Sequence, residues 1–300
     1  MRHFACILAL LAVMFALQPD VGGADLEWFR WKGVPEIAFG GFIADMNAVK
    51  VIASEDGSDR RIVYGDRLGL IHVVRFQDDR FQEEWVSPTL KSAVSEVFVA
   101  DINADGAVEI VAYTELGDIV FYRAENYKQI WRSTEDAFAT ISAMVVANID
   151  DDPQMELVFC GEDRVDVDGF RPSNFGGSAE DRERERIAAV GRLFVFDCQN
   201  LFVEWNSEQG LWARSIVVGD LDDDGVQEIV LNTGFVIDAT YQRVEWEYRN
   251  GFGDEIGYAD VDGDGIPELI GEFRNATRPR RLIRIFDVDL QAESFLSSGR

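Results

Sequence analysis

Four short segments of the sequence place oxygen-bearing side chains at the same fixed positions. Each has Asp or Asn at positions 1, 3 and 5 and Glu at position 9. In segments 101–109, 220–228 and 260–268, a Gly at position 6 tolerates the sharp turn that brings these side chains round one cation. Several hard oxygen ligands suit Ca²⁺, and they suit Zn²⁺ or copper poorly. We therefore predict structural Ca²⁺ sites with these ligands: Asp101, Asn103, Asp105, Glu109, Asn148, Asp150, Asp152, Glu156, Asp220, Asp222, Asp224, Glu228, Asp260, Asp262, Asp264 and Glu268.

These segments differ from EF-hands, which need an acidic residue at position 12 and flanking helices. At that position the sequence has Ala112, Leu231 and Gly271. Segment 148–156 has Pro153 in place of the Gly, and a fifth copy begins at Asp45 but loses its later ligands. We therefore expect three to four calcium sites. The alternative is acidic turns without an ion, because Asp and Asn favour turns in any case.

A second motif recurs between the acidic segments: a Gly, then alternating apolar residues, then a turn and a Trp. Trp28, Trp85, Trp131, Trp205 and Trp246 each lie 14 to 17 residues before the first residue of an acidic segment. Together the two motifs give each unit four short runs of Val, Ile, Phe, Tyr and Trp, which predict four β-strands. We expect the Trp side chains to pack between neighbouring units rather than to bind a ligand.

Four strands in a repeat of roughly 40 to 70 residues are typical of a β-propeller blade. The sequence thus predicts an all-β fold, a β-propeller of about five four-stranded blades, with the Asp-rich loops between first and second strands. The predicted blades span approximately 36–87, 94–133, 140–207, 213–249 and 253–297, within a single domain at 25–300. The third blade contains an insertion at 163–188, which is either a binding loop or a solvated excursion.

This strand pattern, with Asp-x-Asp-x-Asp-Gly-x-x-Glu in its loops, resembles the FG-GAP/VCBS repeat family. That family includes the propellers of integrin α-subunits and of many exported bacterial proteins. The resemblance covers essentially the whole chain after residue 24, with five repeats where the family usually has seven. It implies a propeller stabilised by Ca²⁺ whose faces bind a protein or glycan partner, as an adhesion module does.

The composition restricts the partners and the compartment. With 55 Asp and Glu against 28 Lys and Arg, the formal net charge is −27, which disfavours nucleic acid and anionic membrane surfaces. Residues 1–24 join a basic start, an apolar run too short to span a bilayer and small residues, the pattern of a secretory signal peptide. We expect a secreted, periplasmic or extracellular protein with no membrane span after signal cleavage.

Little else in the sequence could do chemistry. His72 is the only His after residue 24, and we expect it to be a structural residue within a strand. A carbohydrate-active lyase or hydrolase needs only two suitably spaced acids. It therefore stays an alternative, as does a quinoprotein-like periplasmic scaffold or assembly propeller. We predict no enzyme, hence neither catalytic residues nor an organic cofactor.

Two cysteines follow the predicted signal peptide, and both fall in the third predicted blade. Cys160 ends the second strand of that blade, and Cys198 begins the turn after the third strand. In an oxidising compartment an even number of cysteines favours pairing. We therefore expect a disulfide within this blade.

Overall fold

The computed structural model describes residues 46–53, 60–78, 80–150, 152–171, 178–208, 210–274 and 281–296. Contacts group Ile43–Arg300 into one compact unit. The predicted signal peptide, Trp28 and Asp45 lie outside the described residues.

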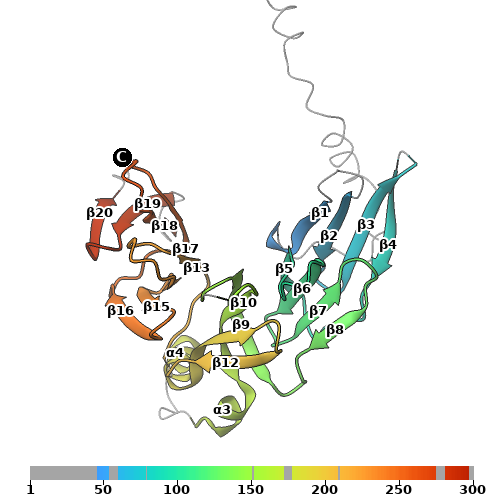
Figure 1. Ribbon diagram of the computed structural model, residues 1–300. Coiled ribbons are helices and arrows are strands. Elements are labelled where there is room, and N and C mark those ends of the chain that lie inside the picture. The colour runs from blue at the N-terminus through green and yellow to red at the C-terminus, as the bar shows by residue number, and fades with distance from the viewer. Residues whose placement is uncertain are drawn as a thin grey trace, which may run out of the picture. The chain divides into compact units, whose positions relative to one another are not determined.

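Five four-stranded antiparallel sheets make up the described chain, each formed by four consecutive strands (Figure 1). A short 3-10 helix, η2 (Met46–Ala48), precedes the first sheet, which contains β1 (Val49–Ala53), β2 (Arg60–Gly65), β3 (Ile71–Gln77) and β4 (Arg80–Val86). The second sheet contains β5 (Val94–Ala100), β6 (Glu109–Thr114), β7 (Ile119–Arg123) and β8 (Gln129–Arg132). The third contains β9 (Phe138–Ala147), β10 (Glu156–Asp163), β11 (Gly191–Asp197) and β12 (Phe202–Asn206). The fourth contains β13 (Ile216–Gly219), β14 (Glu228–Leu231), β15 (Phe235–Asp238) and β16 (Arg243–Glu247). The fifth contains β17 (Glu255–Ala259), β18 (Glu268–Arg274), β19 (Arg281–Asp287) and β20 (Ala292–Leu296).

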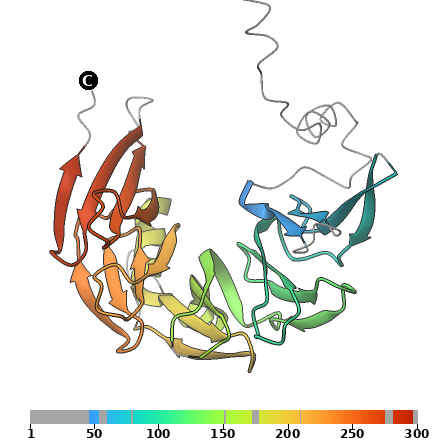
Figure 2. The ribbon, with the colours of Figure 1, turned by 45° about the horizontal axis from the view of Figure 1, so that its top comes forward.

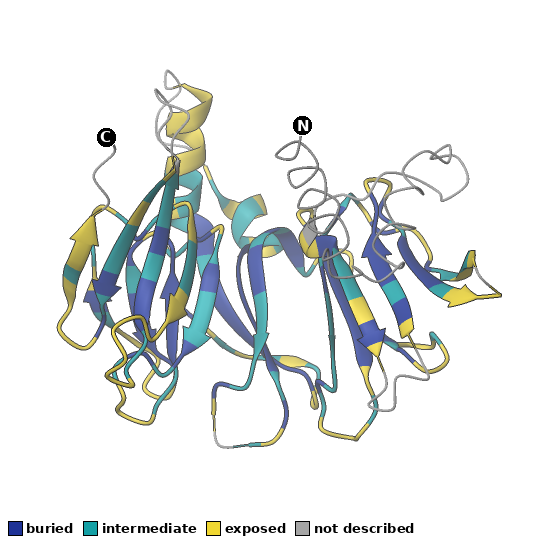
Figure 3. Cartoon of the chain, turned by 90° about the horizontal axis from the view of Figure 1, so that it is seen from above, coloured by how far each residue is buried: buried dark blue, intermediate teal, exposed yellow. Residues whose placement is uncertain are grey.

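The predicted four strands in each of five units are therefore confirmed. Within a sheet, the second strand is the most buried: β6 and β14 are buried at every residue, because they lie inside the sheet and both of their faces are covered. Fourth strands such as β12 alternate between exposed and half-buried residues, as expected for a sheet edge with one covered face. Figure 3 shows this gradient as dark blue inner strands and yellow turns.

Buried apolar clusters join each sheet to the next, and Figure 2 shows neighbouring sheets following one another in chain order. The Trp residues of the repeat contribute to these clusters, as predicted. Trp85 of the first sheet lies 4.8 Å from Tyr122 of the second, measured between ring centroids. Trp131 of the second sheet lies 4.8 Å from Phe196 of the third. Trp205 and Trp246 pack in the next two clusters. Aromatic side chains bury large areas, so these residues are a main source of cohesion between sheets.

The insertion in the third unit contains two helices, α3 (Arg164–Gly169) and α4 (Ala179–Val190). Helix α4 begins with a capping box, in which Ser178 and Asp181 each satisfy a backbone N–H of the other residue. Arg186 of α4 pairs with the buried carboxylate of Glu162 at 3.0 Å. The described part of the insertion is thus ordered against the third sheet, and most of α4 is exposed (Figure 3).

The predicted disulfide is wrong, because Cys160 and Cys198 are both free thiols. Cys160 packs in the cluster between the third and fourth sheets, whereas Cys198 packs in the cluster between the second and third. The two sulfur atoms therefore lie on opposite faces of one sheet, because successive side chains of a strand point to opposite faces. Burial also raises the pKa of both thiols, which makes them unreactive.

We expect a thiol reagent to find no reactive cysteine in the folded chain without residues 1–24. After denaturation without reductant, both Cys160 and Cys198 should react, since neither is paired. Titration with Ellman's reagent before and after adding guanidinium chloride measures this. A mass two protons below the reduced value, with no reactive thiol after denaturation, would contradict the structure.

His72 is a buried structural residue, as predicted. Its Nδ1 lies 2.9 Å from Glu83 Oε2 and its Nε2 3.2 Å from Asp66 Oδ2, and its ring stacks on Tyr64 with centroids 4.7 Å apart. Every polar atom of the ring is thus used within the first sheet. Among the described residues, no helix is long and apolar enough to cross a membrane.

Candidate metal sites

The four acidic segments lie where the sequence predicts them, between the first and second strands of the second to fifth sheets. In each loop the side chain at position 3 accepts a hydrogen bond from the backbone N–H of position 5. Asp222 Oδ1, for example, accepts from the Asp224 N–H at 3.2 Å. The same bond recurs at Asn103, Asp150 and Asp262. All four loops thus share the same hydrogen bond between positions 3 and 5.

A glycine at position 6 closes three of the loops. Gly106, Gly225 and Gly265 have φ of 85°, 86° and 99°, a left-handed conformation that favours Gly. Their N–H groups donate to the position-1 carboxylates of Asp101, Asp220 and Asp260 at 2.8, 3.2 and 3.2 Å. The glycine thus holds the first predicted ligand against the turn.

The loop at 148–156 closes differently, because Pro153 has no N–H to donate. Here the position-1 side chain is an amide, and Asn148 Nδ2 donates to the backbone carbonyl of Asp152 at 2.5 Å. Asn148 therefore braces the loop itself, and it supplies no carboxylate to a metal.

The glutamate at position 9 is the first residue of the second strand, and its side chain points back under the loop. Glu109, Glu156 and Glu228 are at most 1% exposed, and Glu268 is 9% exposed. In every loop, Oε2 of this residue accepts from the backbone N–H of position 2. The oxygen–nitrogen distances are 3.3 Å to Ile102, 3.0 Å to Ile149, 2.6 Å to Leu221 and 2.8 Å to Val261. The other carboxylate oxygen of each residue remains available to a cation.

Burial of these glutamates makes their ionisation costly. Desolvation, with the nearby carboxylates of the same loop, raises the pKa of Glu156 to about 7 and that of Glu228 to about 8. Desolvation also raises the pKa of Glu109 to about 7, with Asp105 and Asp101 adding to the effect. A divalent cation would favour the ionised form of each group, so its binding near neutral pH would release protons.

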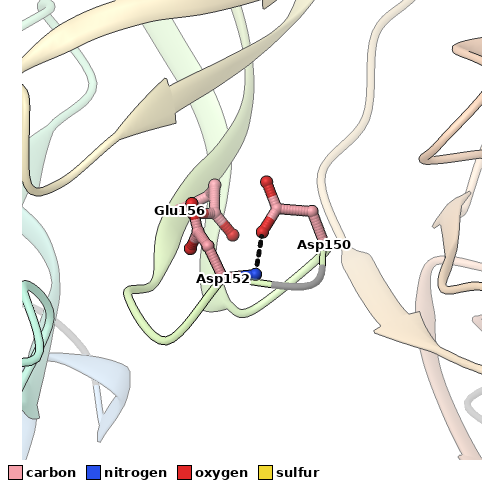
Figure 4. A group of neighbouring side chains, drawn as sticks. All are labelled: Asp150, Asp152 and Glu156. Carbon is pink, nitrogen blue, oxygen red and sulfur yellow. Dashed lines mark hydrogen bonds between the residues drawn. The ribbon is translucent and has the colours of Figure 1, made fainter.

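Three loops bring three carboxylates within 4.8 Å of one another. These clusters are Asp150, Asp152 and Glu156; Asp220, Asp222 and Glu228; and Asp260, Asp262 and Glu268. Figure 4 shows the first of them: Asp150 and Asp152 come from the loop, Glu156 comes from the start of β10, and the carboxylates face a common centre. Such all-oxygen sets fit Ca²⁺.

The loop at 101–109, which matches the sequence motif well, does not form such a cluster. Arg123 at the end of β7 pairs with Asp105 at 2.6 Å and approaches Glu109 Oε1 at 3.9 Å. The hydrogen bond from this guanidinium holds the pKa of Asp105 below its usual value. The protein therefore supplies its own cation at this loop.

Sequence reasoning missed the residue that distinguishes this loop from the others. Arg123 is the cross-strand partner of Glu109, whereas Asp197 and Asp238 are the partners of Glu156 and Glu228. Asp287 takes the same place in the fifth sheet, since it follows Phe286, the partner of Leu269. Desolvation raises the pKa of Asp152 and Asp222, and Asp197 and Asp238 lie close enough to add to the effect. The last residue of each third strand thus distinguishes a loop with a built-in cation from a loop with a carboxylate cluster. Identifying that residue requires the register of the hairpin.

Exchanging Arg123 for Asp should convert the loop at 101–109 into a further calcium site. Arg123→Asp frees Asp105 and reproduces the arrangement at Asp197 and Asp238. We expect calorimetric titration to count one more bound Ca²⁺ in this variant than in the wild type. Arg184→Asp, on the exposed helix α4, makes the same change in net charge and should leave the count unchanged. Equal counts in wild type and Arg123→Asp would contradict this interpretation.

A buried carboxylate oxygen without a hydrogen-bond donor gives a further reason to expect a metal ion. Asp220 Oδ1, in the loop at 220–228, is a buried atom without a hydrogen-bond donor among the described residues. Leaving a carboxylate oxygen buried and without a donor costs stability. A cation beside this oxygen would remove that cost, so the residues of this loop fit Ca²⁺.

Comparison with known proteins gives structural likeness only. No protein-family model matches the chain, and no curated protein matches it either. Among solved structures, Saccharomyces cerevisiae Sqt1 is similar with a TM-score of 0.55 at 12% identity, over 86% of this chain and 70% of Sqt1. The Vibrio cholerae biofilm matrix protein Bap1 gives 0.54 at 16% identity, over 83% of this chain and 38% of Bap1. The computationally designed protein Ika8 gives 0.50 at 11% identity, over 84% of this chain and 62% of that chain. At such identities the likeness concerns the fold.

Proposed function

We propose that the chain is an exported calcium-binding β-propeller of the FG-GAP/VCBS type, and that it acts as a protein- or glycan-binding adhesion module. The observation that carries this proposal is the recurrence of one carboxylate cluster at the same place in three consecutive sheets. A turn that merely favours Asp has no need of a buried Glu beneath it, yet each loop has one.

Further observations support the propeller and its location. Five consecutive four-stranded sheets, joined to one another by buried clusters, are the arrangement that successive blades require. The amino-terminal pattern of a signal peptide favours export, and extracellular calcium suits modules with weak sites. The similar structure of Bap1 is that of a biofilm matrix protein, and a matrix role is compatible with adhesion.

The proposed role is that of a binder, with Ca²⁺ as part of the scaffold. The carboxylates that the repeat places together are the same ones that would hold the ions, so they would not be free to act as catalytic acids. A carbohydrate-active enzyme would need a second acidic pair outside these loops, and a quinoprotein-like scaffold would need no calcium.

Cosedimentation with the source cells and with their extracellular polymer tests the function. The chain without residues 1–24 is labelled and incubated in millimolar Ca²⁺ or in EGTA, at a temperature where both forms are folded. We expect calcium-dependent cosedimentation, and none with washed cells of an unrelated species. Binding to neither fraction would contradict the adhesion role, and equal binding in EGTA would favour the scaffold alternative.

A further inference from the structure

A cavity of about 810 Å³ lies between loops of the third and fourth sheets and receives one of the carboxylate clusters. Asp150 and Asp152 line it from the third sheet, together with Glu204 on β12. Gln227, Thr240 and Gln242 line it from the fourth sheet. Its volume falls within the range of small-molecule binding sites. The cavity therefore joins a candidate ion site to a wall of amide and hydroxyl side chains.

The loop at this cavity has carboxylates at three of its four predicted ligand positions, whereas the other two loops have them at all four. Loops 220–228 and 260–268 contribute carboxylates from positions 1, 3 and 9, and the glycine N–H holds the position-1 carboxylate in place. In the loop at 148–156 the position-1 residue is Asn148, whose amide donates to the Asp152 carbonyl. A Ca²⁺ ion takes six to eight oxygen ligands. An ion held by Asp150, Asp152 and Glu156 would therefore keep coordination positions open, and the lining of the cavity by Asp150 and Asp152 places those positions toward it.

The Glu156 carboxylate belongs to the same cluster as the two aspartates that line the cavity. Glu156 is 1% exposed, and its Oε2 accepts a hydrogen bond from the Ile149 N–H. Figure 4 shows this carboxylate beside those of Asp150 and Asp152, and one ligand oxygen of each lies within 4.8 Å of the others. An ion among the three side chains would offset the cost of burying the glutamate charge.

We propose that Ca²⁺ at Asp150, Asp152 and Glu156 binds a neutral glycan through two adjacent hydroxyl groups in this cavity. The inference rests on the proposed function, and it names the ligand class of that binding module. A sugar hydroxyl can ligate the ion through a lone pair while donating its hydrogen to a carboxylate such as Glu204. Gln227, Thr240 and Gln242 supply donors and acceptors for the remaining hydroxyls.

The charges of the residues that line the cavity favour a neutral ligand over a charged one. The described residues that line the cavity include no Lys, Arg or His, so an anionic ligand would face Glu204 without a compensating cation besides the ion. An amine or guanidinium cannot ligate Ca²⁺, because it has no free lone pair when charged. A neutral polyol is not repelled by Glu204, and its hydroxyl groups can ligate the ion.

Nuclear magnetic resonance titration with methyl α-mannoside and methyl β-galactoside tests the inference, in millimolar Ca²⁺ and in EGTA. We expect binding of at least one glycoside in Ca²⁺ and loss of that binding in EGTA. Asp150→Asn should weaken it more than tenfold, and Gln242→Ala, on the opposite wall, several-fold. The matched control is Asp262→Asn, which alters a cluster in the fifth sheet and should retain glycan binding.

The outcomes separate this inference from the function on which it rests. If Ca²⁺ stabilises the protein but neither glycoside binds, the glycan inference is wrong and the calcium-binding fold stands. Binding that persists in EGTA, or binding only of a sialylated glycan or an Arg-rich peptide, would also overturn the inference. If Ca²⁺ neither binds nor stabilises the protein, the proposed function itself fails.

Discussion

Removal of calcium with excess EGTA is expected to lower the melting temperature of the chain without residues 1–24 by on the order of 2 to 17 °C. Extracellular modules bind Ca²⁺ with a Kd of roughly 0.1 to 1 mM, so each site contributes about 0.4 to 1.4 kcal/mol at ~1 mM ion. Three clusters are present in the described residues. For a chain of this size, about 1 kcal/mol shifts the melting temperature by roughly 2 to 4 °C. Differential scanning fluorimetry in calcium and in EGTA measures the shift.

Glu228→Gln tests the origin of that shift. The amide keeps the size of the side chain and an oxygen for the Leu221 N–H, but it removes the charge that would hold the ion. Because the buried carboxylate is costly when no ion is present, the variant should be at least as stable as wild type in EGTA. Its gain on adding Ca²⁺ should be smaller by about one third, since one of three similar sites is lost.

Glu115→Gln, an exposed position in the second sheet's turn, is the control and should show the full gain. A wild-type protein that melts at one temperature with and without calcium would remove the main support for the proposed function.

Gly117→Ala should destabilise the protein strongly. Gly117 lies in the turn between β6 and β7 with φ of 86°, and a Cβ there would lie 2.2 Å from the Phe138 carbonyl oxygen of the next sheet. The left-handed conformation costs about 1 kcal/mol for Ala, and overlap with backbone adds about 1 to 3 kcal/mol. We expect a loss of about 2 to 4 kcal/mol in urea denaturation performed in calcium.

Gly210→Ala separates the two causes. Gly210 has φ of 96°, but its Cβ would have only an ordinary contact, 3.6 Å from the Ala188 carbonyl oxygen. This variant should lose about 1 kcal/mol, the conformational part alone. Equal losses in the two variants would mean that Gly117 does not hold the second and third sheets at close approach.

The fold could be predicted from the sequence because the same pattern recurs in every unit. The Trp at the end of each unit and the acidic loop after it predicted four strands per unit and five units, which the sheets confirm. The Trp packing followed for the same reason, since a residue that recurs in every unit contacts the same neighbour in every unit. Helix α3 escaped notice because six residues with no buried side chain carry no periodic signal.

The errors came from information that single strands do not carry. Cys160 was expected to end its strand, but β10 continues to Asp163. Face alternation and the hairpin register also place Cys198 against the opposite sheet. Arg123 was overlooked for a related reason: its pairing with Glu109 depends on how β7 aligns with β6. Local spacing predicted the loop ligands well, whereas contacts made across a hairpin required the structure.

Arg123 gives the molecule a graded dependence on its surroundings. Its guanidinium is a counterion built into the second sheet, and it is present whatever the medium contains. If their clusters hold Ca²⁺ as proposed, the third, fourth and fifth sheets depend for the same neutralisation on a diffusible ion. As ambient calcium falls, repulsion between carboxylates would grow in the carboxyl-terminal three sheets and leave the second nearly unchanged. The second sheet would thus keep its stability at any calcium concentration, whereas the stability of the last three sheets would rise and fall reversibly with ambient calcium.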